Sequence, residues 1–274
     1  MIIGFQGEHG AYSEQAVRQH FGQKVETLPC RSFLEIFQAI QNGRATHGML
    51  PVENSLAGTV IPAYDLLVDH DLHVQCEVVV RVEHCLMAPP GTPLAEVERA
   101  MSHYQALGQC EQTLRRMGIE PVTYYDTAGA ARELAENPEP GTAAIASALA
   151  AETYGLEILV KNLEDMDFNY PRFFVLGHGM PERQDPSKTS LILTTRHVPG
   201  SLSQVLAELA ERDINLTKIE SRPRRNRPWH YLFYIDFEGH EEDTAVQGAL
   251  LGILKKASFL KVLGSYPAAK QEES

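Results

Sequence analysis

Short apolar runs alternate with amphipathic segments over the first part of the chain. The run "MIIGF" has the length and apolar content of a buried strand, and a glycine loop and an amphipathic stretch typical of a helix follow it. A helix over Phe33 to Gln41 and a strand that ends at Pro51 come next. Strand, helix and strand at this spacing predict βαβ units and a mainly parallel sheet. The same alternation recurs between Glu77 and about Gly179, so we expect an α/β fold as far as that point.

A segment rich in proline and charged residues, Gly179 to Ser190, is the best candidate for a linker. Beyond it the pattern predicts strand, helix, two strands, helix and strand, which is the βαββαβ order of a ferredoxin-like domain. Glu220 and Arg222 alternate along one of these strands, and one interpretation is a sheet edge whose charges face solvent. The pattern therefore predicts two domains, over residues 1–180 and 190–267.

The chain has 274 residues, which leaves room for two domains of ordinary size. Its formal net charge of −12 argues against nucleic acid or an anionic membrane as a partner, since both need a basic surface. The apolar runs are too short for a transmembrane helix, and the first residues lack the basic segment of a signal peptide. The cysteines form no CxxC pair. Reduced thiols in a cytoplasmic protein are therefore the simplest interpretation.

Small or neutral polar residues follow four of the predicted strands, where the next helix begins. Such residues can cap a helix, so each turn taken alone is also compatible with an ordinary structural turn. The four are "QGEHGAYSE", "PVENSLAG" with Glu53, Asn54 and Ser55, "MSHYQALGQC" with Ser102, His103 and Gln105, and "YDTAGAA" with Asp126 and Thr127.

Arg172 stands in the stretch "DMDFNYPRFF", which runs on into an apolar strand. A charged group beside such a strand is costly to bury without a partner. Together with the four turns, this arginine suits a polyanion of low mass that is held by N–H groups, hydroxyls and one guanidinium. The histidine and cysteine spacings match no metal site, and we expect His70, His73 and His84 to be solvated or to cap helices.

The motifs taken together resemble those of the monofunctional bacterial prephenate dehydratases. "GFQGEHGAYSEQA", "PVENSLAG", "SHYQAL", "DTAGAA" and "NYPRFF" occur in that family's order and at its distances, and "GSL" and "NLTKIESRP" resemble the phenylalanine-binding motifs of its C-terminal ACT domain. Each motif is weak by itself, whereas the ordered set is highly specific and covers essentially the whole chain. The resemblance implies a catalytic domain of two α/β lobes like a periplasmic binding protein, with the site in the cleft and the second lobe at about 77–163. It also implies ACT domains that pair across subunits and bind phenylalanine at that interface, hence a homodimer or homotetramer.

The resemblance further implies a reaction in which prephenate loses its ring carboxylate as CO2 and its ring hydroxyl as water, giving phenylpyruvate. Prephenate is a dianion, and aromatisation drives its reaction without a metal or organic cofactor. Arg172 would bind a substrate carboxylate, while Asn54 and Gln105 would orient the substrate by hydrogen bonds. Carried over from the family, the catalytic residues would be Asn54, Ser55, Thr127 and Arg172, and the substrate-binding residues Glu53, His103, Gln105, Ala106, Ala128, Asn169 and Phe173. The phenylalanine site would comprise Gly200, Ser201, Leu202, Asn215, Leu216, Thr217, Glu220 and Ser221.

One position departs from the family pattern. The usual motif is Thr-Arg-Phe, whose threonine is regarded as essential to activity, and this chain has Pro171 in its place. Thr127, Ser55 or a bound water would then assist the departing hydroxyl, and we expect activity at reduced efficiency. Three alternatives stay open: an arogenate dehydratase, a prephenate decarboxylase that retains the hydroxyl, and a phenylalanine sensor without chemistry. The ACT domain argues against a decarboxylase, since feedback by phenylalanine suits a pathway to phenylalanine.

Overall fold

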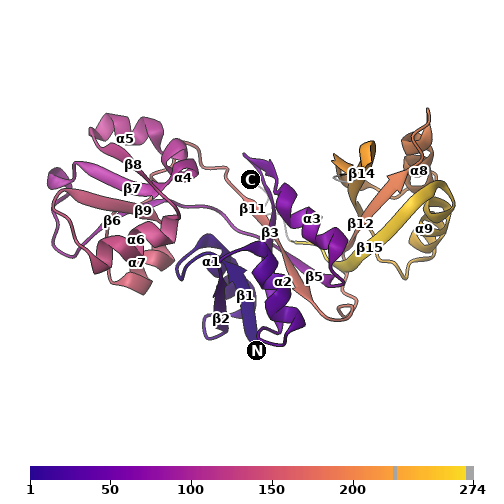
Figure 1. Ribbon diagram of the computed structural model, residues 1–274, viewed down its shortest axis with the longest axis horizontal. Coiled ribbons are helices and arrows are strands. Elements are labelled where there is room, and N and C mark those ends of the chain that lie inside the picture. Colours follow the sequence, from indigo (N-terminus) through magenta and orange to yellow (C-terminus); the bar gives the residue numbers. More distant parts are fainter. Residues whose placement is uncertain (225–226, 270–274) are drawn as a thin grey trace. The chain divides into compact units, whose positions relative to one another are not determined.

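The computed structural model describes residues 1–224 and 227–269 of the chain (Figure 1). The chain forms two compact units, one of Met1–Val60 with Val78–Phe173 and the other of Ile61–Glu77 with Phe174–Ser274. The boundary between the units passes through two strands, β5 (His73–Val79) and β11 (Pro171–Gly177). None of the helices in the described part of the chain has the length and apolar character needed to cross a membrane.

The first lobe is built on the predicted strand, helix and strand pattern. Its elements are β1 (Ile2–Gln6), α1 (Tyr12–Phe21), β2 (Glu26–Cys30), α2 (Phe33–Gln41), β3 (His47–Asn54) and β4 (Gly58–Thr59). The strands β1 and β2 run parallel, as do β1 and β3, and the sheet has the order β2-β1-β3-β11-β5, with β4 paired to β3. Helix α2 has the predicted limits, because the Ser32 side chain accepts a hydrogen bond from the Glu35 N–H and so caps its first turn.

The second lobe is a layered α/β structure. Its elements are β6 (Cys85–Ala88), the 3₁₀ helix η1 (Leu94–Glu96), β7 (Arg99–His103), α4 (Tyr104–Gln109), α5 (Glu111–Met117), β8 (Glu120–Tyr124), α6 (Thr127–Glu136), β9 (Thr142–Ala146), α7 (Ala148–Tyr154) and β10 (Glu157–Val160). The sheet has the order β10-β6-β9-β7-β8, in which β7 runs parallel to β8 and β9, whereas β6 runs antiparallel to β9 and β10. Helices α4 and α5 cover one face and α6 and α7 the other (Figure 1). The lobe has a core of its own around Leu86, Ala100 and Ile145.

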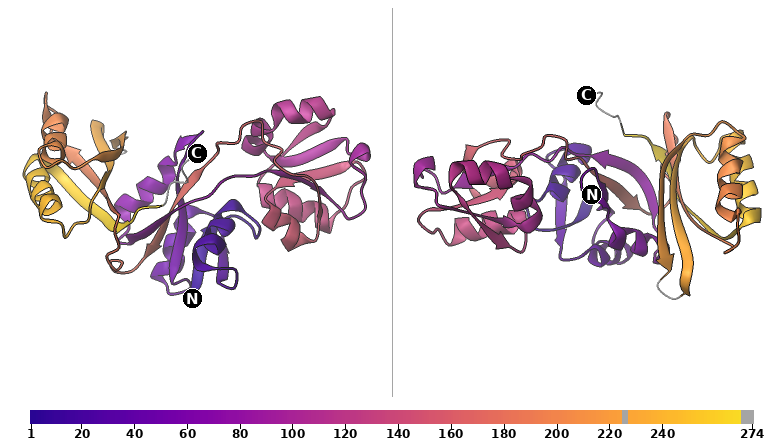
Figure 2. Two further views of the ribbon diagram at one scale, coloured as in Figure 1. Left: turned by 180° about the vertical axis from the view of Figure 1, so that it is seen from behind. Right: turned by 90° about the horizontal axis from the view of Figure 1, so that it is seen from above.

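The C-terminal elements confirm the predicted βαββαβ order. They are β12 (Ser187–Thr195), α8 (Ser201–Ala210), β13 (Leu216–Arg224), β14 (Arg227–Glu238), α9 (Thr244–Lys256) and β15 (Ala257–Pro267). The sheet order is β13-β14-β12-β15 and each neighbouring pair is antiparallel, as in a ferredoxin-like domain. Helices α8 and α9 lie side by side on one face of the sheet (Figure 2), over a core that includes Leu193, Val205 and Phe237. The predicted fold class, two α/β lobes followed by this domain, is confirmed.

The second face of the C-terminal sheet is also covered, which the sequence pattern did not reveal. Helix α3 (Ile61–Asp69) belongs to the same compact unit, and the Tyr64 ring lies 4.6 Å from that of Tyr234, measured between centroids. Lys261 donates hydrogen bonds to the Leu67 and His70 carbonyls, at N–O distances of 3.0 and 2.6 Å. This ammonium group satisfies carbonyls at the end of α3 that have no partner within the helix.

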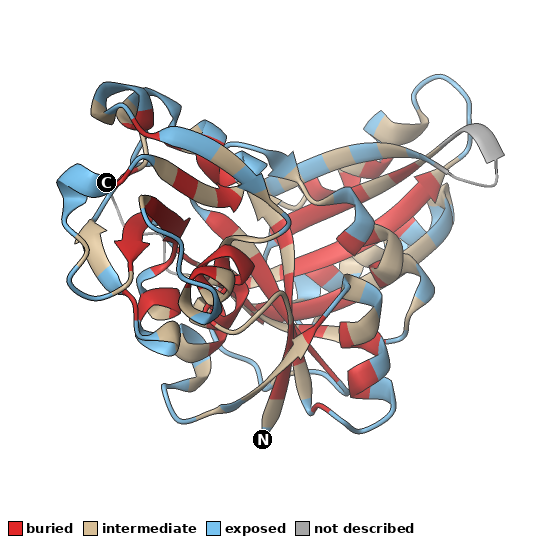
Figure 3. Ribbon diagram, turned by 60° about the vertical axis from the view of Figure 1, so that its left-hand side comes forward, coloured by how far each residue is buried: buried red, intermediate tan, exposed pale blue. Residues whose placement is uncertain are grey.

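Arg222 corrects the interpretation of a solvated strand edge. Its guanidinium forms an ion pair with the Asp65 carboxylate of α3, and the two side chains are only 19% and 14% exposed. The face that bears Arg222 and Glu220 is thus turned toward α3, while Ile219 on the opposite face of the strand is 43% exposed. Figure 3 shows how the buried positions concentrate along the strands of the sheets.

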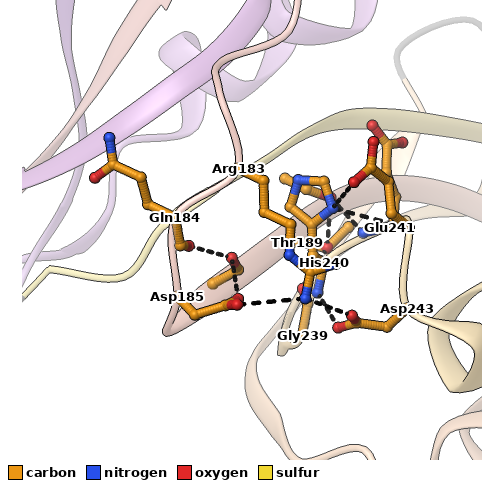
Figure 4. Close-up of polar contacts among 11 residues, drawn as sticks. Arg183, Gln184, Asp185, Thr189, Gly239, His240, Glu241 and Asp243 are labelled. Atoms are coloured by element: carbon orange, nitrogen blue, oxygen red, sulfur yellow. Dashed lines mark hydrogen bonds and ion pairs between the residues drawn. The ribbon is translucent and has the colours of Figure 1, made fainter.

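The predicted linker between Gly179 and Ser190 is anchored to the C-terminal domain. Strand β12 already begins at Ser187, and the Thr189 hydroxyl donates to the Gly239 carbonyl at 2.7 Å (Figure 4). Arg183 forms ion pairs with Asp243 at 2.7 Å and Asp185 at 3.4 Å, between nitrogen and oxygen. The second half of this segment is therefore part of the domain that follows it.

Candidate functional site

Arg172 is the second residue of strand β11, and its guanidinium lies against the carboxylate of Glu53, near the end of β3. The Nη2 and Nε atoms of Arg172 lie 2.9 and 3.1 Å from one oxygen, Oε2 of Glu53. The Arg172 side chain is only 12% exposed, whereas that of Glu53 is 33% exposed. The charge beside the apolar strand is therefore stabilised by a charge-assisted hydrogen bond within the protein.

Pro171 is the first residue of β11 and is buried. A proline is tolerated at this point because the first residue of a strand need not donate to the ladder. Its carbonyl accepts a hydrogen bond from the Val80 N–H, at 3.1 Å between nitrogen and oxygen. Pro171 also lines a cavity, so a side chain at this position reaches the space that the candidate substrate-binding groups surround.

That cavity has a volume of about 380 Å³ and is formed by the turn after β3, helix α4 and the start of β11. Its size suits a small organic acid. It is lined by Pro51, Glu53, Asn54, Leu56, Ala57, Val60, Gln105, Gly108, Gln109 and Pro171. Three residues predicted from the sequence, Glu53, Asn54 and Gln105, thus share one cavity.

A chain of amide side chains connects the two lobes at this cavity. The Asn54 Nδ2 atom donates to Oδ1 of Asn169 at 2.7 Å, and Nδ2 of Asn169 donates to Oε1 of Gln109 at 3.0 Å. Asn54 Oδ1 in turn accepts hydrogen bonds from the backbone N–H groups of Leu56 and Ala57, at 2.8 and 2.9 Å. Asn54 therefore shapes its own turn and also contacts a second predicted site residue, the buried Asn169.

The chain of amides continues into a buried histidine. His84 is 2% exposed, and its Nε2 atom lies 2.7 Å from Gln109 Oε1 while its Nδ1 atom lies 2.7 Å from the Tyr12 hydroxyl. Burial lowers the pKa of His84, although Gln109 and Glu164 act in the opposite direction. Burial has the opposite effect on Tyr12, whose pKa it raises, because here the deprotonated form is the charged one. The expectation of a solvated or capping histidine was therefore wrong for His84.

Sequence reasoning also missed Gln109 and Tyr12 as parts of the site. Gln109 stands in the quoted stretch "MSHYQALGQC", but nothing in its spacing indicated that it faces Asn169. Tyr12 belongs to the glycine loop motif, and its contact with His84 joins residues 72 apart in the sequence. Local patterns do not report contacts of this range.

Ser55 holds the segment that precedes β11. Its hydroxyl donates to the Phe168 carbonyl and accepts from the Tyr170 N–H, both at 2.8 Å. The single proton of this hydroxyl is thus donated to a backbone carbonyl of the protein. The bond fixes the turn after β3 to the loop that carries Asn169.

The remaining candidate residues of the second lobe lie on α4 and α6. His103 caps α4 by accepting a hydrogen bond from the Gln105 N–H at 3.4 Å, and Ala106 is buried. Thr127 is the first residue of α6, and Ala128 is fully buried. Neither Thr127 nor Ala128 belongs to the lining of the 380 Å³ cavity. Phe173, a predicted substrate-binding residue, is 2% exposed and is not among the residues that line this cavity.

The glycine loop after β1 joins the first lobe to α7 of the second. Gly10 has a φ of +86°, and a Cβ atom there would come within 2.6 Å of the Ala150 Cα. The Ser147 hydroxyl donates to the Gly10 carbonyl at 2.6 Å. Glu14, which is fully buried, accepts from the Gly10 N–H at 2.7 Å and from Arg18 Nη2 at 2.8 Å. The need for glycine here follows from this close packing between lobes.

The residues predicted for phenylalanine binding form two groups in the C-terminal domain. Gly200, with a φ of +81°, precedes α8, and Ser201 and Leu202 open it, whereas Asn215 and Leu216 follow its last turn. The helix has 10 residues, which corresponds to a length of roughly 15 Å. Leu216 packs partly against the domain core, and Thr217, Glu220 and Ser221 continue along the edge strand β13. Strand β13 begins beyond the end of α8 and runs antiparallel to β14.

Groups of three or more histidine, cysteine, aspartate or glutamate side chains able to hold a metal ion do not occur in the described ranges.

The profile of the prephenate dehydratase family matches residues 3–181, and that of the ACT domain matches residues 189–254. Arogenate dehydratase/prephenate dehydratase 2 of Arabidopsis thaliana, a chloroplastic protein, is 41% identical over 276 residues, which cover 97% of this chain and 72% of that protein. Arogenate dehydratase 1 of Petunia hybrida is 42% identical over 283 residues, covering 97% and 66% of the two chains.

Two solved structures are similar over nearly the full length. A prephenate dehydratase of Arthrobacter aurescens in complex with L-Phe is 30% identical, with a TM-score of 0.89 and coverage of 98% of this chain and 90% of that chain. GqqA, described as a novel type of quorum quenching acylase, is 38% identical, with a TM-score of 0.92 and coverage of 98% of both chains.

Proposed function

Because the chain belongs to the prephenate dehydratase family and carries a C-terminal ACT domain, we propose that it converts prephenate to phenylpyruvate and that phenylalanine regulates it. The observation that carries the proposal is the position of Arg172. Its guanidinium is largely buried against Glu53, which lines the cavity beside Asn54 and Gln105. Arg172 is not among the residues that line this cavity, whereas its partner Glu53 and the neutral amides of Asn54 and Gln105 are. A cationic group next to a space of this size suits a small dianion.

The proposed reaction breaks two bonds of prephenate. The bond between the ring and its carboxylate breaks, CO2 leaves, and the electron pair enters the ring. The carbon–oxygen bond of the ring hydroxyl breaks at the opposite carbon, and that oxygen takes one proton and leaves as water. Prephenate and one proton thus give phenylpyruvate, CO2 and water. The protein has to hold the ring carboxylate where the loss of hydration favours CO2 release, and to supply hydrogen bonds to the departing oxygen.

Arg172 binds one substrate carboxylate in this proposal. A guanidinium has five N–H donors, and the Nη2 and Nε atoms of Arg172 lie 2.9 and 3.1 Å from Oε2 of Glu53. The substrate carboxylate binds the guanidinium beside that oxygen or displaces it. Asn54 and Gln105, which line the same cavity, orient the substrate by hydrogen bonds.

The departing hydroxyl needs a donor other than residue 171. Ser55 is poorly suited, because its proton is bonded to the Phe168 carbonyl. Thr127 has a hydroxyl without a hydrogen-bond partner among residues 1–224 and 227–269, but it does not line the cavity as described. A bound water is the third candidate. We therefore propose that the reaction proceeds at lower efficiency than a threonine at position 171 would allow.

Arogenate is the alternative substrate, because the curated relatives are described as arogenate dehydratases or as arogenate/prephenate dehydratases. Arogenate carries an ammonium group where prephenate has a ketone. Initial rates of product release with the two substrates, measured side by side on the purified chain, test the proposal. We expect faster release of phenylpyruvate from prephenate than of phenylalanine from arogenate. Faster turnover of arogenate would reassign the substrate, and no turnover of either would refute the dehydratase.

An acylase is the second candidate function, since GqqA is described as one and is similar over the whole chain. Amide hydrolysis needs a water that a basic group activates. The side chains of Asn54, Gln105 and Gln109 in the cavity are amides that do not take up a proton near neutral pH, and Glu53 is bonded to Arg172. This composition supports the dehydratase. Release of a free amine from an N-acyl amide in the same assay would favour the acylase.

We further propose that phenylalanine binds between the ACT domains of two copies in a homodimer or homotetramer. The ACT domain match and the structure of a related prephenate dehydratase in complex with L-Phe support phenylalanine as the effector. Phenylalanine and substrate then weaken each other's binding by the same factor. This coupling can be measured by calorimetric titration with phenylalanine, in the presence and absence of a substrate analogue that does not react. Equal affinity for phenylalanine in both titrations would refute the coupling. Thermal stabilisation by phenylalanine alone would equally suit a sensor without chemistry.

We also propose two domains, at residues 1–180 and 190–267, with the second lobe of the first domain at about 77–163. We further propose a cytoplasmic location. Cys30, Cys76, Cys85 and Cys110 are free thiols, and burial raises the pKa of the first three to about 11. Such thiols are little ionised and suit a reducing compartment. Limited proteolysis that cleaves after residue 180 and before β12 begins at Ser187 would support the domain limits.

A further inference from the structure

The candidate cavity takes its lining from both lobes. Asn54 lies at the end of β3 in the first lobe, whereas Gln105 lies on α4 in the second lobe. A substrate that contacts both side chains therefore needs the two lobes to be held at a fixed distance. The lobes also touch outside the cavity, where the Ser147 hydroxyl of the second lobe donates to the carbonyl of Gly10 in the glycine loop.

The glycine loop, residues 7–10, is fixed to the first lobe. The Gly7 N–H donates to the Cys30 carbonyl at 3.0 Å, and the Gly10 N–H donates to the buried Glu14 carboxylate at 2.7 Å. The loop therefore moves with the first lobe as one body. Any contact that it makes with the second lobe helps to set the distance between the lobes.

Glu8 extends from this loop to two groups of the second lobe. Its Oε2 atom lies 2.8 Å from Nη1 of Arg132, and its Oε1 atom accepts a hydrogen bond from the Tyr125 hydroxyl at 3.2 Å. Nη2 of Arg132 donates in turn to the Tyr125 oxygen at 3.0 Å, so the three side chains form a closed triangle. Burial and the Glu8 carboxylate raise the pKa of Tyr125, and its hydroxyl therefore keeps the proton that it donates.

A glycine within α6 makes room for the Tyr125 ring. A Cβ atom at Gly129 would lie 2.7 Å from both Cζ and the hydroxyl oxygen of Tyr125, so the ring can lie there only because residue 129 has no side chain. Glycine is less favourable than alanine within a helix. Tyr125 is 58% exposed, so its position buries little apolar surface in return. What the arrangement provides is the hydroxyl contact with Glu8 across the lobes.

We propose that Glu8, Tyr125 and Arg132 form a latch between the lobes and act as positioning residues for the substrate. The latch favours the arrangement in which both lobes line the cavity, here called closed. The proposal deepens the proposed function, and its kinetic part rests on that function. The Glu8 and Arg132 side chains are 31% and 36% exposed, so the latch can open without uncovering a core, and salt weakens it. A substrate binds more weakly when the closed arrangement is less populated.

Glu8→Ala removes the latch and leaves the lining of the cavity unchanged. We expect the KM for prephenate to rise about 10-fold with little change in kcat, because substrate binding then has to supply the free energy of closure. Glu8→Gln keeps an acceptor oxygen and should raise KM less. A loss of kcat at unchanged KM is the result of a smaller folded fraction, and it would overturn the latch.

Glu139→Ala is the matched control for Glu8→Ala. It removes the partner of Arg99 in an ion pair that lies wholly within the second lobe, at 3.5 Å between nitrogen and oxygen. We expect wild-type kinetic constants in this variant. A rise in KM equal to that of Glu8→Ala would overturn the latch, because it would assign the effect to the loss of a surface charge.

Gly129→Ala separates the latch from the stability of α6. An alanine favours the helix but displaces the Tyr125 ring. We expect KM to rise about 3-fold or more, as in Tyr125→Phe, without a fall in the thermal midpoint. Wild-type KM in both variants, or a KM that rises only together with a lowered midpoint, would overturn the role of Tyr125.

The distance between the lobes can be measured without turnover. Spin labels at Gln38→Cys on α2 and Glu152→Cys on α7, two exposed positions, report it in the full chain. Cys76→Ser is added because the other three native cysteines are buried. Double electron–electron resonance should give a longer or broader distance distribution in Glu8→Ala than in the chain with Glu8, and about 1 M salt should move the latter toward it.

Equal distance distributions with and without Glu8 would overturn the latch, even if prephenate is a good substrate. A distribution that changes as expected, in a chain that turns over neither prephenate nor arogenate, would support the latch and refute the proposed function. The failure of one proposal is thus distinguishable from the failure of the other.

Discussion

At the scale of single residues, Arg172 and Pro171 have different explanations. The guanidinium of Arg172 is stabilised beside its strand by Glu53, and Glu53 lines the cavity. Pro171 fits the first position of β11 without loss of a ladder bond, and its side chain lines the cavity. The backbone therefore does not require proline there, and a hydroxyl at position 171 would reach the same space.

Pro171→Thr should raise kcat on prephenate by about 10-fold or more, because a hydroxyl in the cavity can assist the departing oxygen. Steady-state assays of phenylpyruvate release measure this effect. Pro171→Val is the matched control, since it has the shape of threonine and restores the N–H without adding a hydroxyl. An equal gain in the valine variant would assign the effect to the backbone.

Glu14→Gln should destabilise the first lobe in a manner that depends on pH. Burial alone would raise the pKa of Glu14, but hydrogen bonds from the Gly10 N–H, Arg18 and Thr27 outweigh it and lower the pKa from 4.5. A lowered pKa means that the carboxylate stabilises the fold above pH 4.5 and that this stability is lost as the pH falls further.

Denaturant unfolding at several pH values measures this prediction. At neutral pH we expect Glu14→Gln to lose about 2 kcal/mol, as for a hydrogen bond to a charged group. The difference from the wild type should shrink as the pH falls below 4.5. Glu152→Gln, at an exposed position of α7, is the control and should change little. A deficit that stays constant with pH would contradict the account of Glu14.

At the scale of elements, the turn after β3 has both a structural and a proposed functional part. Asn54 bonds the N–H groups of its own turn, as an ordinary capping residue does, and its nitrogen joins the chain of amides. Ser55 fixes this turn to the loop before β11. Neighbouring side chains of this motif thus have different roles, some structural and some proposed to be functional. The spacing of the motif alone does not distinguish these roles.

Ser55→Ala should loosen the loop rather than abolish the chemistry. The loss of its bonds to Phe168 and Tyr170 leaves the segment around Asn169 less well held. Hydrogen exchange followed by mass spectrometry should show faster exchange in peptides that cover residues 165–170, with KM raised more than kcat is lowered. A fall in kcat of about 100-fold with unchanged exchange would instead make Ser55 the proton donor.

The order of the elements could be predicted from the sequence, whereas the contacts of the site could not. The limits of α2 follow from local signals, its apolar periodicity and the Ser32 cap. The Asn54–Asn169 bond joins residues 115 apart, and no local signal reports it. His84 was misjudged for the same reason, because its burial depends on Tyr12 and Gln109, which are distant in the sequence.

At the scale of the whole molecule, residues 61–77 belong to the same compact unit as the C-terminal sheet. Helix α3 follows the cavity-lining turn directly in the sequence and packs on the C-terminal sheet through Tyr64 and Asp65. Arg222, on the strand that carries the predicted phenylalanine residues Glu220 and Ser221, is the partner of Asp65. The proposed coupling between phenylalanine and substrate can be tested at this ion pair.

Asp65→Asn should therefore weaken the coupling between phenylalanine and substrate. We expect the factor by which phenylalanine raises the KM for prephenate to fall by about 3-fold or more, within the range of allosteric coupling energies. Arg183→Met is the matched control, since it breaks an ion pair with Asp243 in the same unit without touching α3. Unchanged coupling in Asp65→Asn, or an equal change in the control, would rule out this link.

The central claim is that one active site removes both the carboxylate and the hydroxyl of prephenate. It is tested most directly by carbon-13 NMR of prephenate labelled in the ring carboxylate and incubated with the purified chain. We predict that labelled CO2 and phenylpyruvate appear together in equal amounts, faster than in a sample without protein. Labelled CO2 with a product that retains the hydroxyl, or no conversion above the spontaneous rate, would contradict the claim.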